Sequence, residues 1–292
     1  MIRRMKEPMI LKAEEIKGLL PKRTADSNKG TYGKLLVIAG RKECAGCAIL
    51  SALAALRSGL GMVKVISAKS NFTALMNAVP EALFSSKTDE AALEADVAWA
   101  DAILMGPGIG TGKKAEKLLS FVLDTRGIPV VIDADGINLL SQNDYLREAL
   151  KTKAAADTVI MTPHLMEMSR FAGLSVSDIK KSMTETAVSI AKTYSITVSL
   201  KDARTITASS YGDVIINTTG NNGMSTAGSG DVLAGVIASF LTQSLSGFVA
   251  ASLGVYVHGM AGDIAAERYG VRGMKAMDIA EALPELFLRI ER

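Results

Sequence analysis

Short apolar runs alternate with longer segments of helical period from Lys34 almost to the C-terminus, and this alternation restricts the fold more than any other feature. The runs are rich in β-branched residues and nearly continuous, which is typical of strands buried on both faces. Such an alternation predicts an α/β fold with a mostly parallel sheet and helices on both faces. The expected strands are 35–39, 63–67, 102–105, 130–133, 158–162 and 196–200.

Between these strands the pattern favours helices, and near the end it favours an antiparallel hairpin. The segments 205–208 and 214–217 flank the turn 209–213, which is typical of a hairpin at a sheet edge. No stretch resembles an interdomain linker, so we expect one domain over 21–292, preceded by an N-terminal extension over 1–20. The expected helices include 47–58, 113–124, 144–154 and 177–194.

Charge and targeting signals narrow the class of protein. The net charge is only +3, no long basic run occurs and aromatics are 5%, which disfavours nucleic-acid binding. The start mixes charged with isolated apolar residues, so no signal peptide is expected and the predicted location is cytoplasmic. The stretch 232–262 lacks charged residues, but polar residues interrupt it, which favours two buried helices over a membrane span.

Ligands of parallel α/β proteins bind at the carboxyl ends of the strands, so the segments that follow the strands are candidate sites. A glycine turn containing Gly40 and Gly46 leads into a helix and either holds an anion or only packs tightly. The loop 106–112 has four glycines, including Gly108 and Gly110, which is typical of a binding loop. Next come Asp133, Asp135 and Asn138, which either bind Mg²⁺ or a ribose or, for the last two, cap the following helix.

Two further strand ends carry titratable residues. His164 and Glu167 stand three apart on one incipient turn, where either a binding or a structural role is open. After the last parallel strand come two cations in a short loop, which suit either a solvated edge or a phosphate partner. That loop consists of Lys201, Asp202, Ala203, Arg204 and Thr205.

The most informative segment is 218–231, where glycines and hydroxyl residues lead into a long uncharged helix. The first turn of a helix has N–H groups without intrahelical partners, and its dipole favours negative charge. We therefore expect Gly228, Ser229 and Gly230 to form an anion hole. Asp231 is either the N-cap of this helix or, as we favour, a base beside the bound phosphate.

Cys44 and Cys47 are the only cysteines and form a Cys-x-x-Cys motif. Zinc would need two more ligands, and the two histidines, His164 and His258, are not in a paired spacing. A thioredoxin-like dithiol remains open, but we favour two small residues that line a close-packed turn.

The Gly228-Ser229-Gly230-Asp231 sequence after an Asn/Gly-rich lead resembles the signature of the ribokinase-like superfamily. The full set of motifs resembles one branch, the ADP/ATP-dependent NAD(P)H-hydrate dehydratase family, from about Pro21 to Leu288. The motifs are Lys29-Gly30-Thr31-Tyr32-Gly33, Ala54-Ala55-Leu56-Arg57-Ser58-Gly59, Gly106-Pro107-Gly108-Ile109-Gly110, Asp133-Ala134-Asp135, Thr162-Pro163-His164 with Glu167, and Gly220-Asn221-Asn222-Gly223-Met224.

The resemblance implies a repair enzyme that removes water from the S-form of NADH-hydrate or NADPH-hydrate, with ADP, or alternatively ATP, as co-substrate. It implies that ADP yields AMP and phosphate, with Mg²⁺ at the nucleotide phosphates, and a homotetramer. An epimerase domain is expected to be absent, because the chain is too short for both domains.

By the same resemblance, the hydrate contacts Cys47, Gly108, Gly110, His164 and Asp231. Asp231 is the catalytic base, Glu167 a candidate metal ligand, and the nucleotide lies along Lys201, Asp202, Ala203, Arg204, Thr205 and Gly230. Three residues depart from the family pattern: Cys47 replaces an alanine, Asp202 a glycine and Asn222 a proline.

Two alternatives stay open. One is a kinase of the same superfamily that phosphorylates a small alcohol of the hydroxyethylthiazole or pyridoxal type. The other is a nucleotide-sensing protein with a degenerate site, which would bind adenine nucleotide without turnover.

Overall fold

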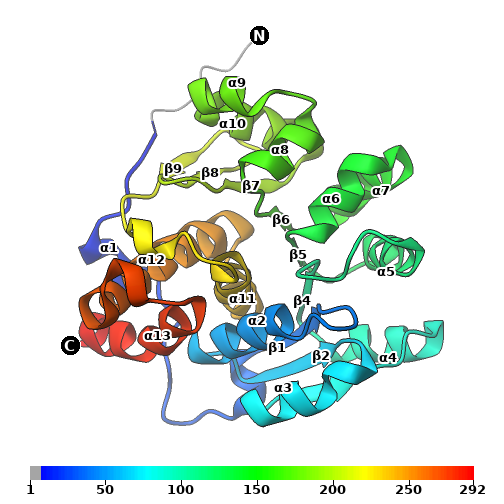
Figure 1. Cartoon of the computed structure of the whole chain (residues 1–292), viewed down its shortest axis with the longest axis horizontal. Helices are drawn as coiled ribbons and strands as arrows, with labels where there is room; N and C mark the ends of the chain where they lie inside the picture. The colour runs from blue at the N-terminus through cyan, green and yellow to red at the C-terminus, as the bar shows by residue number, and fades with distance from the viewer. Residues whose placement is uncertain (1–7) are drawn as a thin grey trace.

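The computed structural model describes residues 8–292, so the first seven residues of the predicted N-terminal extension lie outside the described part. A sheet in the order β3-β2-β1-β4-β5-β6-β7-β8-β9 forms the centre (Figure 1). Pairing is parallel from β3 to β7 and antiparallel for the last two strands, so the predicted sheet and its edge hairpin are confirmed. The strands are β1 Lys34–Ile38, β2 Met62–Ile66, β3 Leu83–Ser85, β4 Ala102–Met105, β5 Val130–Ile132, β6 Val159–Met161, β7 Thr197–Leu200, β8 Ile206–Ala208 and β9 Val214–Ile216.

Thirteen helices surround the sheet in the described chain. Those predicted over 47–58, 113–124 and 144–154 are confirmed within two residues, but the prediction over 177–194 is wrong. Ser182 leaves the helical region at φ −143° and ψ 46°, so two helices meet there. The helices are α1 Ala13–Leu19, α2 Gly46–Arg57, α3 Phe72–Ala78, α4 Glu90–Trp99, α5 Lys113–Asp124, α6 Asp135–Gln142, α7 Asp144–Ala156, α8 Leu165–Ala172, α9 Val176–Lys181, α10 Met183–Tyr194, α11 Ser229–Thr242, α12 Gly247–Gly273 and α13 Ala276–Glu291.

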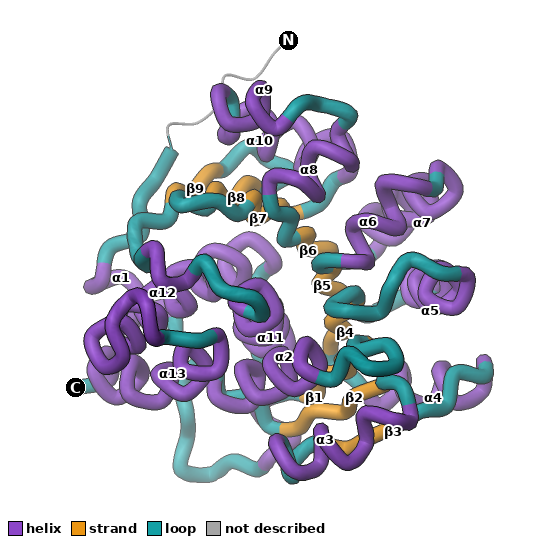
Figure 2. Tube along the Cα trace, in the orientation of Figure 1, coloured by secondary structure: helices purple, strands orange, loops and turns teal. Residues whose placement is uncertain are grey.

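The sheet separates two apolar cores, because successive side chains of a strand point to opposite faces. In β1, Leu35 and Val37 pack with helices α2, α11, α12 and α13, whereas Leu36 and Ile38 pack with α4 to α10. Figure 2 shows these two groups of helices on opposite sides of the strands. Burial on both faces explains why the strands are continuous apolar runs.

Helices α11 and α12 account for the long stretch without charged residues. Both are largely buried and are joined by a short polar turn, as predicted. By length and composition α12 could cross a membrane, but 78% of its apolar window is buried inside this fold. Its apolarity therefore follows from its place in the core.

The described part of the predicted extension packs on the domain. Ile16 of α1 is fully buried in the core that contains α12 and α13, and Met9 forms a parallel bridge with Ile215 of β9.

The carboxyl ends of β1, β4, β5, β6 and β7 meet at one edge of the sheet. The strand order reverses direction between β1 and β4, because β1 pairs with both β2 and β4. Open α/β sheets bind ligands at such a point. Here the loops after the two strands are joined by the Gly40 N–H donating to the Pro107 carbonyl (2.9 Å) and the Arg41 N–H donating to the Gly108 carbonyl (2.7 Å).

Candidate active site

The start of α11 is built around Gly228, its N-cap, which adopts the left-handed conformation (φ 90°) that glycine tolerates. The Ser229 N–H already donates to the Thr226 carbonyl (3.3 Å). Within residues 8–292, the N–H groups of Gly230 and Asp231 have no acceptor. Of the three residues predicted to form the anion hole, Ser229 therefore has its N–H occupied, whereas the N–H groups of Gly228 and Gly230 have no acceptor within the described residues.

A buried ion pair faces this helix start. The Lys201 ammonium donates to the Asp133 carboxylate at 2.8 Å, and Thr162 Oγ1 donates to the same oxygen at 2.7 Å. A Cβ added at Gly230 would lie 3.3 Å from Lys201 Nζ. Burial alone would lower the pKa of Lys201, but the charges of Asp133 and Glu167 raise it, so a cation is held against the free amides.

The Asp231 side chain lies beside that cation. Asp231 is the third residue of α11, so it is not the N-cap, and the alternative of simple capping is wrong. Burial and then the charge of Asp133 raise the pKa of Asp231 to about 7 from 3.8, while Lys201 acts in the opposite direction. A carboxyl with a pKa near the working pH suits a general base.

Residues His164 and Glu167 form the start of α8. The His164 ring accepts the Met166 and Glu167 N–H groups through Nδ1, and the Glu167 carboxylate accepts the His164 N–H at 2.8 Å. Burial and the charge of Asp133 raise the pKa of Glu167 to about 7, whereas Lys201 opposes this. Both predicted residues thus also have a structural role at this helix start.

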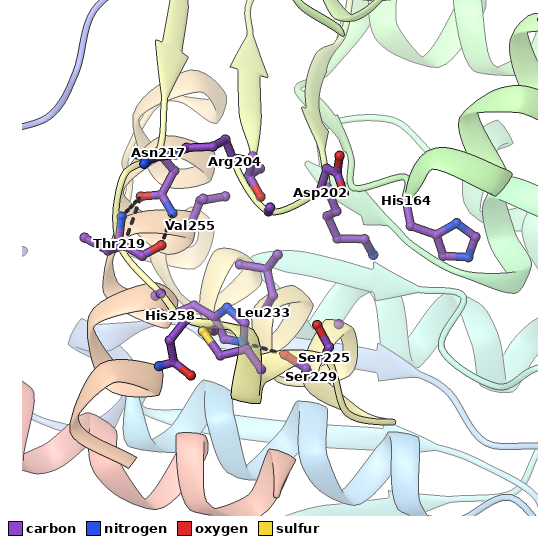
Figure 3. A pocket seen from close by; sticks show the side chains of 18 of the residues that line it. His164, Asp202, Arg204, Asn217, Thr219, Ser225, Ser229, Leu233, Val255 and His258 are labelled. Carbon is purple, nitrogen blue, oxygen red and sulfur yellow. Dashed lines mark hydrogen bonds between the residues drawn. The ribbon is translucent and has the colours of Figure 1, made fainter. Parts of the chain in front are cut away.

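A cavity of about 910 Å³ opens between α11, α12 and the β7–β8 loop (Figure 3). All five residues of the predicted nucleotide loop, Lys201 to Thr205, line it together with Gly230 and His164. Its far wall is the glycine-rich lead over 217–222. The structure therefore brings together the two segments that the sequence predicted to hold the nucleotide.

The other predicted substrate-binding residues lie at the reversal point between β1 and β4 and do not line this cavity. Gly108 (φ 61°) packs so tightly that an added Cβ would lie 2.3 Å from Cys47 Sγ. The Gly110 N–H donates to the Asp135 carboxylate at 2.8 Å, so this aspartate holds the glycine loop and does not cap α6, whose N-cap is Ala134. Asp231 connects the two halves of the site, because its charge acts on both Lys201 and the Cys47 thiol.

Asn138 also does not cap α6. Its side-chain oxygen accepts a hydrogen bond from Arg170 Nη1 at 2.9 Å, and the residue lies inside the helix.

Sequence reasoning missed two residues that shape the site. His258, considered only as a zinc ligand, places Nε2 3.4 Å from Ser229 Oγ, and burial lowers its pKa to about 4. Asp263 accepts the Gly220 N–H (3.0 Å) and the Asn221 side-chain amide (2.9 Å) and so orders the glycine-rich lead. Its position as the acid that ends an uncharged stretch was the available signal.

The residues around the helix start fit a magnesium ion that arrives with a nucleotide. Within residues 8–292 no three His, Cys, Asp or Glu side chains form a metal cage. Proteins that transfer phosphoryl groups usually hold Mg²⁺ by one or two carboxylates, waters and substrate phosphates. Asp133 and Glu167, both close enough to act on the Lys201 charge, offer such carboxylates.

Comparison with solved structures finds a similar fold over nearly the whole chain. The ADP/ATP-dependent NAD(P)H-hydrate dehydratase from Bacillus subtilis, co-crystallised with ATP and Mg²⁺, superposes with a TM-score of 0.85 at 28% identity. The match covers 98% of this chain and 99% of the bacterial one.

Two curated relatives are similar to this chain in sequence. The bifunctional NAD(P)H-hydrate repair enzyme of Moorella thermoacetica is 35% identical over 97% of this chain, but the chain spans only 54% of its length. The ADP-dependent (S)-NAD(P)H-hydrate dehydratase of Neisseria meningitidis serogroup B is also 35% identical, over 92% of this chain and 90% of its own. The family model described as NAD(P)H-hydrate dehydratase matches residues 35–285, and the chain therefore belongs to the NAD(P)H-hydrate dehydratase family.

Proposed function

We propose that this protein dehydrates the S-forms of NADH-hydrate and NADPH-hydrate at the expense of ADP, giving the reduced dinucleotide, AMP and phosphate. The observation that carries the proposal is the juxtaposition at the start of α11: two unpaired amides, the Lys201 cation and the Asp231 carboxyl with a pKa of about 7. Amides and a cation stabilise a phosphoryl group in transfer. The carboxylate accepts the proton of the attacking hydroxyl.

The chemistry runs in two steps. In the first step, Asp231 takes the proton of the ring hydroxyl while the hydroxyl oxygen bonds to the β-phosphorus of ADP. The bond between that phosphorus and the bridging oxygen breaks, and AMP leaves. In the second, the carbon–oxygen bond breaks and phosphate leaves with the electron pair, while the ring nitrogen supplies electrons to the vacated carbon. The adjacent ring carbon then loses a proton to solvent, and the electron pair of that carbon–hydrogen bond forms the double bond. Water is thereby removed from the ring and appears in the phosphate.

The two halves of the site suit the two substrates. ADP would lie in the cavity along Lys201, Asp202, Ala203, Arg204, Thr205 and Gly230, whereas the hydrated ring would contact Cys47, Gly108, Gly110 and His164. His164 lines the nucleotide cavity, so in this proposal it stands where the two substrates meet. Asp133 and Glu167 would hold Mg²⁺, which neutralises phosphate charge when bound.

A direct assay tests the proposal. Purified protein is incubated with NADH-hydrate and ADP while the absorbance of the reduced nicotinamide ring and the release of phosphate are followed. Both should rise together and in equal amounts. No rise in either would remove the proposal, and a stable phosphorylated product would favour the small-alcohol kinase instead.

The choice of co-substrate and dinucleotide is tested in the same assay. We propose that ADP is used in preference to ATP, and kcat/KM for each nucleotide with each hydrate measures this. A homotetramer and a cytoplasmic location complete the proposal. Light scattering of the purified chain checks the first, and fractionation of cells checks the second.

A further inference from the structure

Cys44 and Cys47 lie at the start of α2 with their sulfur atoms in contact. The two sulfurs are 3.8 Å apart, and both cysteines are free. A disulfide bond is about 2.0 Å long, so closure needs the sulfurs to approach by about 1.8 Å. Cys44 belongs to the turn before the helix and Cys47 to its first turn, so a small change of the turn suffices.

The two thiols differ in access to reagents. Cys47 is only 8% exposed, whereas Cys44 is partly exposed. Burial and the charge of Asp231 raise the pKa of Cys47, so its thiolate is scarce. Cys44 is therefore the sulfur that an external reagent reaches first, and Cys47 is the neighbour that attacks second.

The same two sulfurs support the glycine loop of the site. A Cβ at Gly108 would lie 2.3 Å from Cys47 Sγ and 3.0 Å from Cys44 Sγ, so the loop backbone packs on both. The turn that carries Cys44 is bonded to the loop as well, through the Arg41 N–H and the Gly108 carbonyl. Arg41 also packs on Gly110, since its Cδ would lie 3.2 Å from a Cβ there. Movement of either sulfur must therefore displace the loop.

We propose that Cys44 and Cys47 form a reversible intramolecular disulfide that displaces the 106–110 loop and lowers turnover of the hydrate. The effect on turnover rests on the proposed function, whereas disulfide formation does not. The co-reactant is a low-molecular-weight disulfide such as oxidised glutathione. Cys44 attacks it as thiolate and releases one thiol. Cys47 then loses its proton and attacks Cys44 Sγ, which releases the second thiol.

In the experiment, the full chain is equilibrated in mixtures of reduced and oxidised glutathione, and the remaining thiols are alkylated. Mass spectrometry then gives the number of alkylated thiols. Both thiols should disappear together, and dithiothreitol should restore both. The oxidised protein should show about 10-fold lower kcat/KM for the hydrate. Its Kd for ADP should stay within about twofold, since the cysteines do not line the nucleotide cavity.

The matched control is Cys44→Ala, which keeps Cys47 in place and should retain its activity in every glutathione mixture. Hydrogen exchange of the 106–112 segment gives a second readout that needs no substrate. The exchange rate should change on oxidation in the unmutated chain and not in Cys44→Ala.

Two thiols that persist, or only a mixed disulfide with glutathione, overturn the proposal. So does a disulfide that leaves both exchange and kcat/KM unchanged. If the reduced chain turns over no hydrate, the proposed function fails. The protein mass and the hydrogen exchange then still show whether the disulfide forms and displaces the loop.

Discussion

Helices α2 and α11 pack against each other, and both begin without a side-chain cap, α2 after Ala45 and α11 after Gly228. What surrounds their first turns differs. The first turn of α11 faces Lys201 and Asp133, whereas the first turn of α2 meets the Gly108 backbone through Cys47. A helix start becomes a strong anion site only where other strand ends bring charge to it, and of these two helices α11 has that charge.

The largest effect should come from Asp231→Asn, which removes the proposed base from α11 and leaves its amides in place. We expect kcat to fall by about 10²- to 10⁴-fold, because a general base contributes about that much. The Kd for ADP should stay within about threefold, a change below about 1 kcal/mol. Steady-state kinetics and calorimetric titration measure the two quantities.

The control is Asp124→Asn, which changes an exposed acid at the end of α5 and should behave as the parent protein. Equal kinetics for both variants would show that α11 carries no base.

The buried ion pair is the next feature to break. Lys201→Met should lower the free energy of unfolding by about 3 kcal/mol, because it leaves the Asp133 carboxylate buried without its cation. Urea unfolding measures this free energy.

The double variant Lys201→Met with Asp133→Asn should regain much of the lost stability. As a control, Lys151→Met removes a pair whose side chains are 43% and 69% exposed, and should cost less than about 1 kcal/mol. Equal losses for the two lysines would contradict the role given to Lys201.

One added methyl group on each helix start compares them directly. Gly230→Ala should raise the Kd for ADP by about 10-fold, since the new Cβ lies 3.3 Å from Lys201 Nζ, the cation proposed to bind the phosphates. Gly46→Ala meets nothing within 4 Å at the start of α2, so it should leave the Kd unchanged and stabilise the protein by up to about 1 kcal/mol. Titration of both variants with ADP separates the helices. Equal shifts in Kd would mean that α11 is not the nucleotide site.

The smallest effect concerns pH. The pKa of Asp231 rises from 3.8 to about 7 on folding, so the folded state binds this proton more tightly than the unfolded chain. Its stabilising contribution is complete below about pH 4 and is lost as the pH rises to about 7. Relative to Asp231→Asn, the parent protein should lose on the order of 1 kcal/mol of unfolding free energy between pH 5 and pH 8. Urea unfolding at both pH values tests this, and parallel profiles would contradict the shifted pKa.

Much of the fold was predictable because burial leaves a direct mark on a sequence. Strands covered on both faces must be apolar throughout, and all six predicted runs are strands of the sheet. The prediction failed where burial is weak. Strand β3 has only three residues, and Leu83 in it is 49% exposed, so no apolar run marks it. The sequence pattern predicts one helix where α9 and α10 stand, because Ser182, where they meet, is compatible with a helix or with a turn.

The sequence by itself determined that strands and helices alternate, that their loops gather at one edge of the sheet, and that a glycine-rich turn precedes the uncharged helix α11. Only the tertiary structure decided which groups meet there. Asp133, Glu167, Lys201 and Asp231 come from or follow different strands, and neither their ion pair nor the raised pKa values of the acids can be read from local spacing. The physical reason is that periodicity records which side chains leave water, whereas electrostatic coupling depends on distances between segments that are remote along the chain.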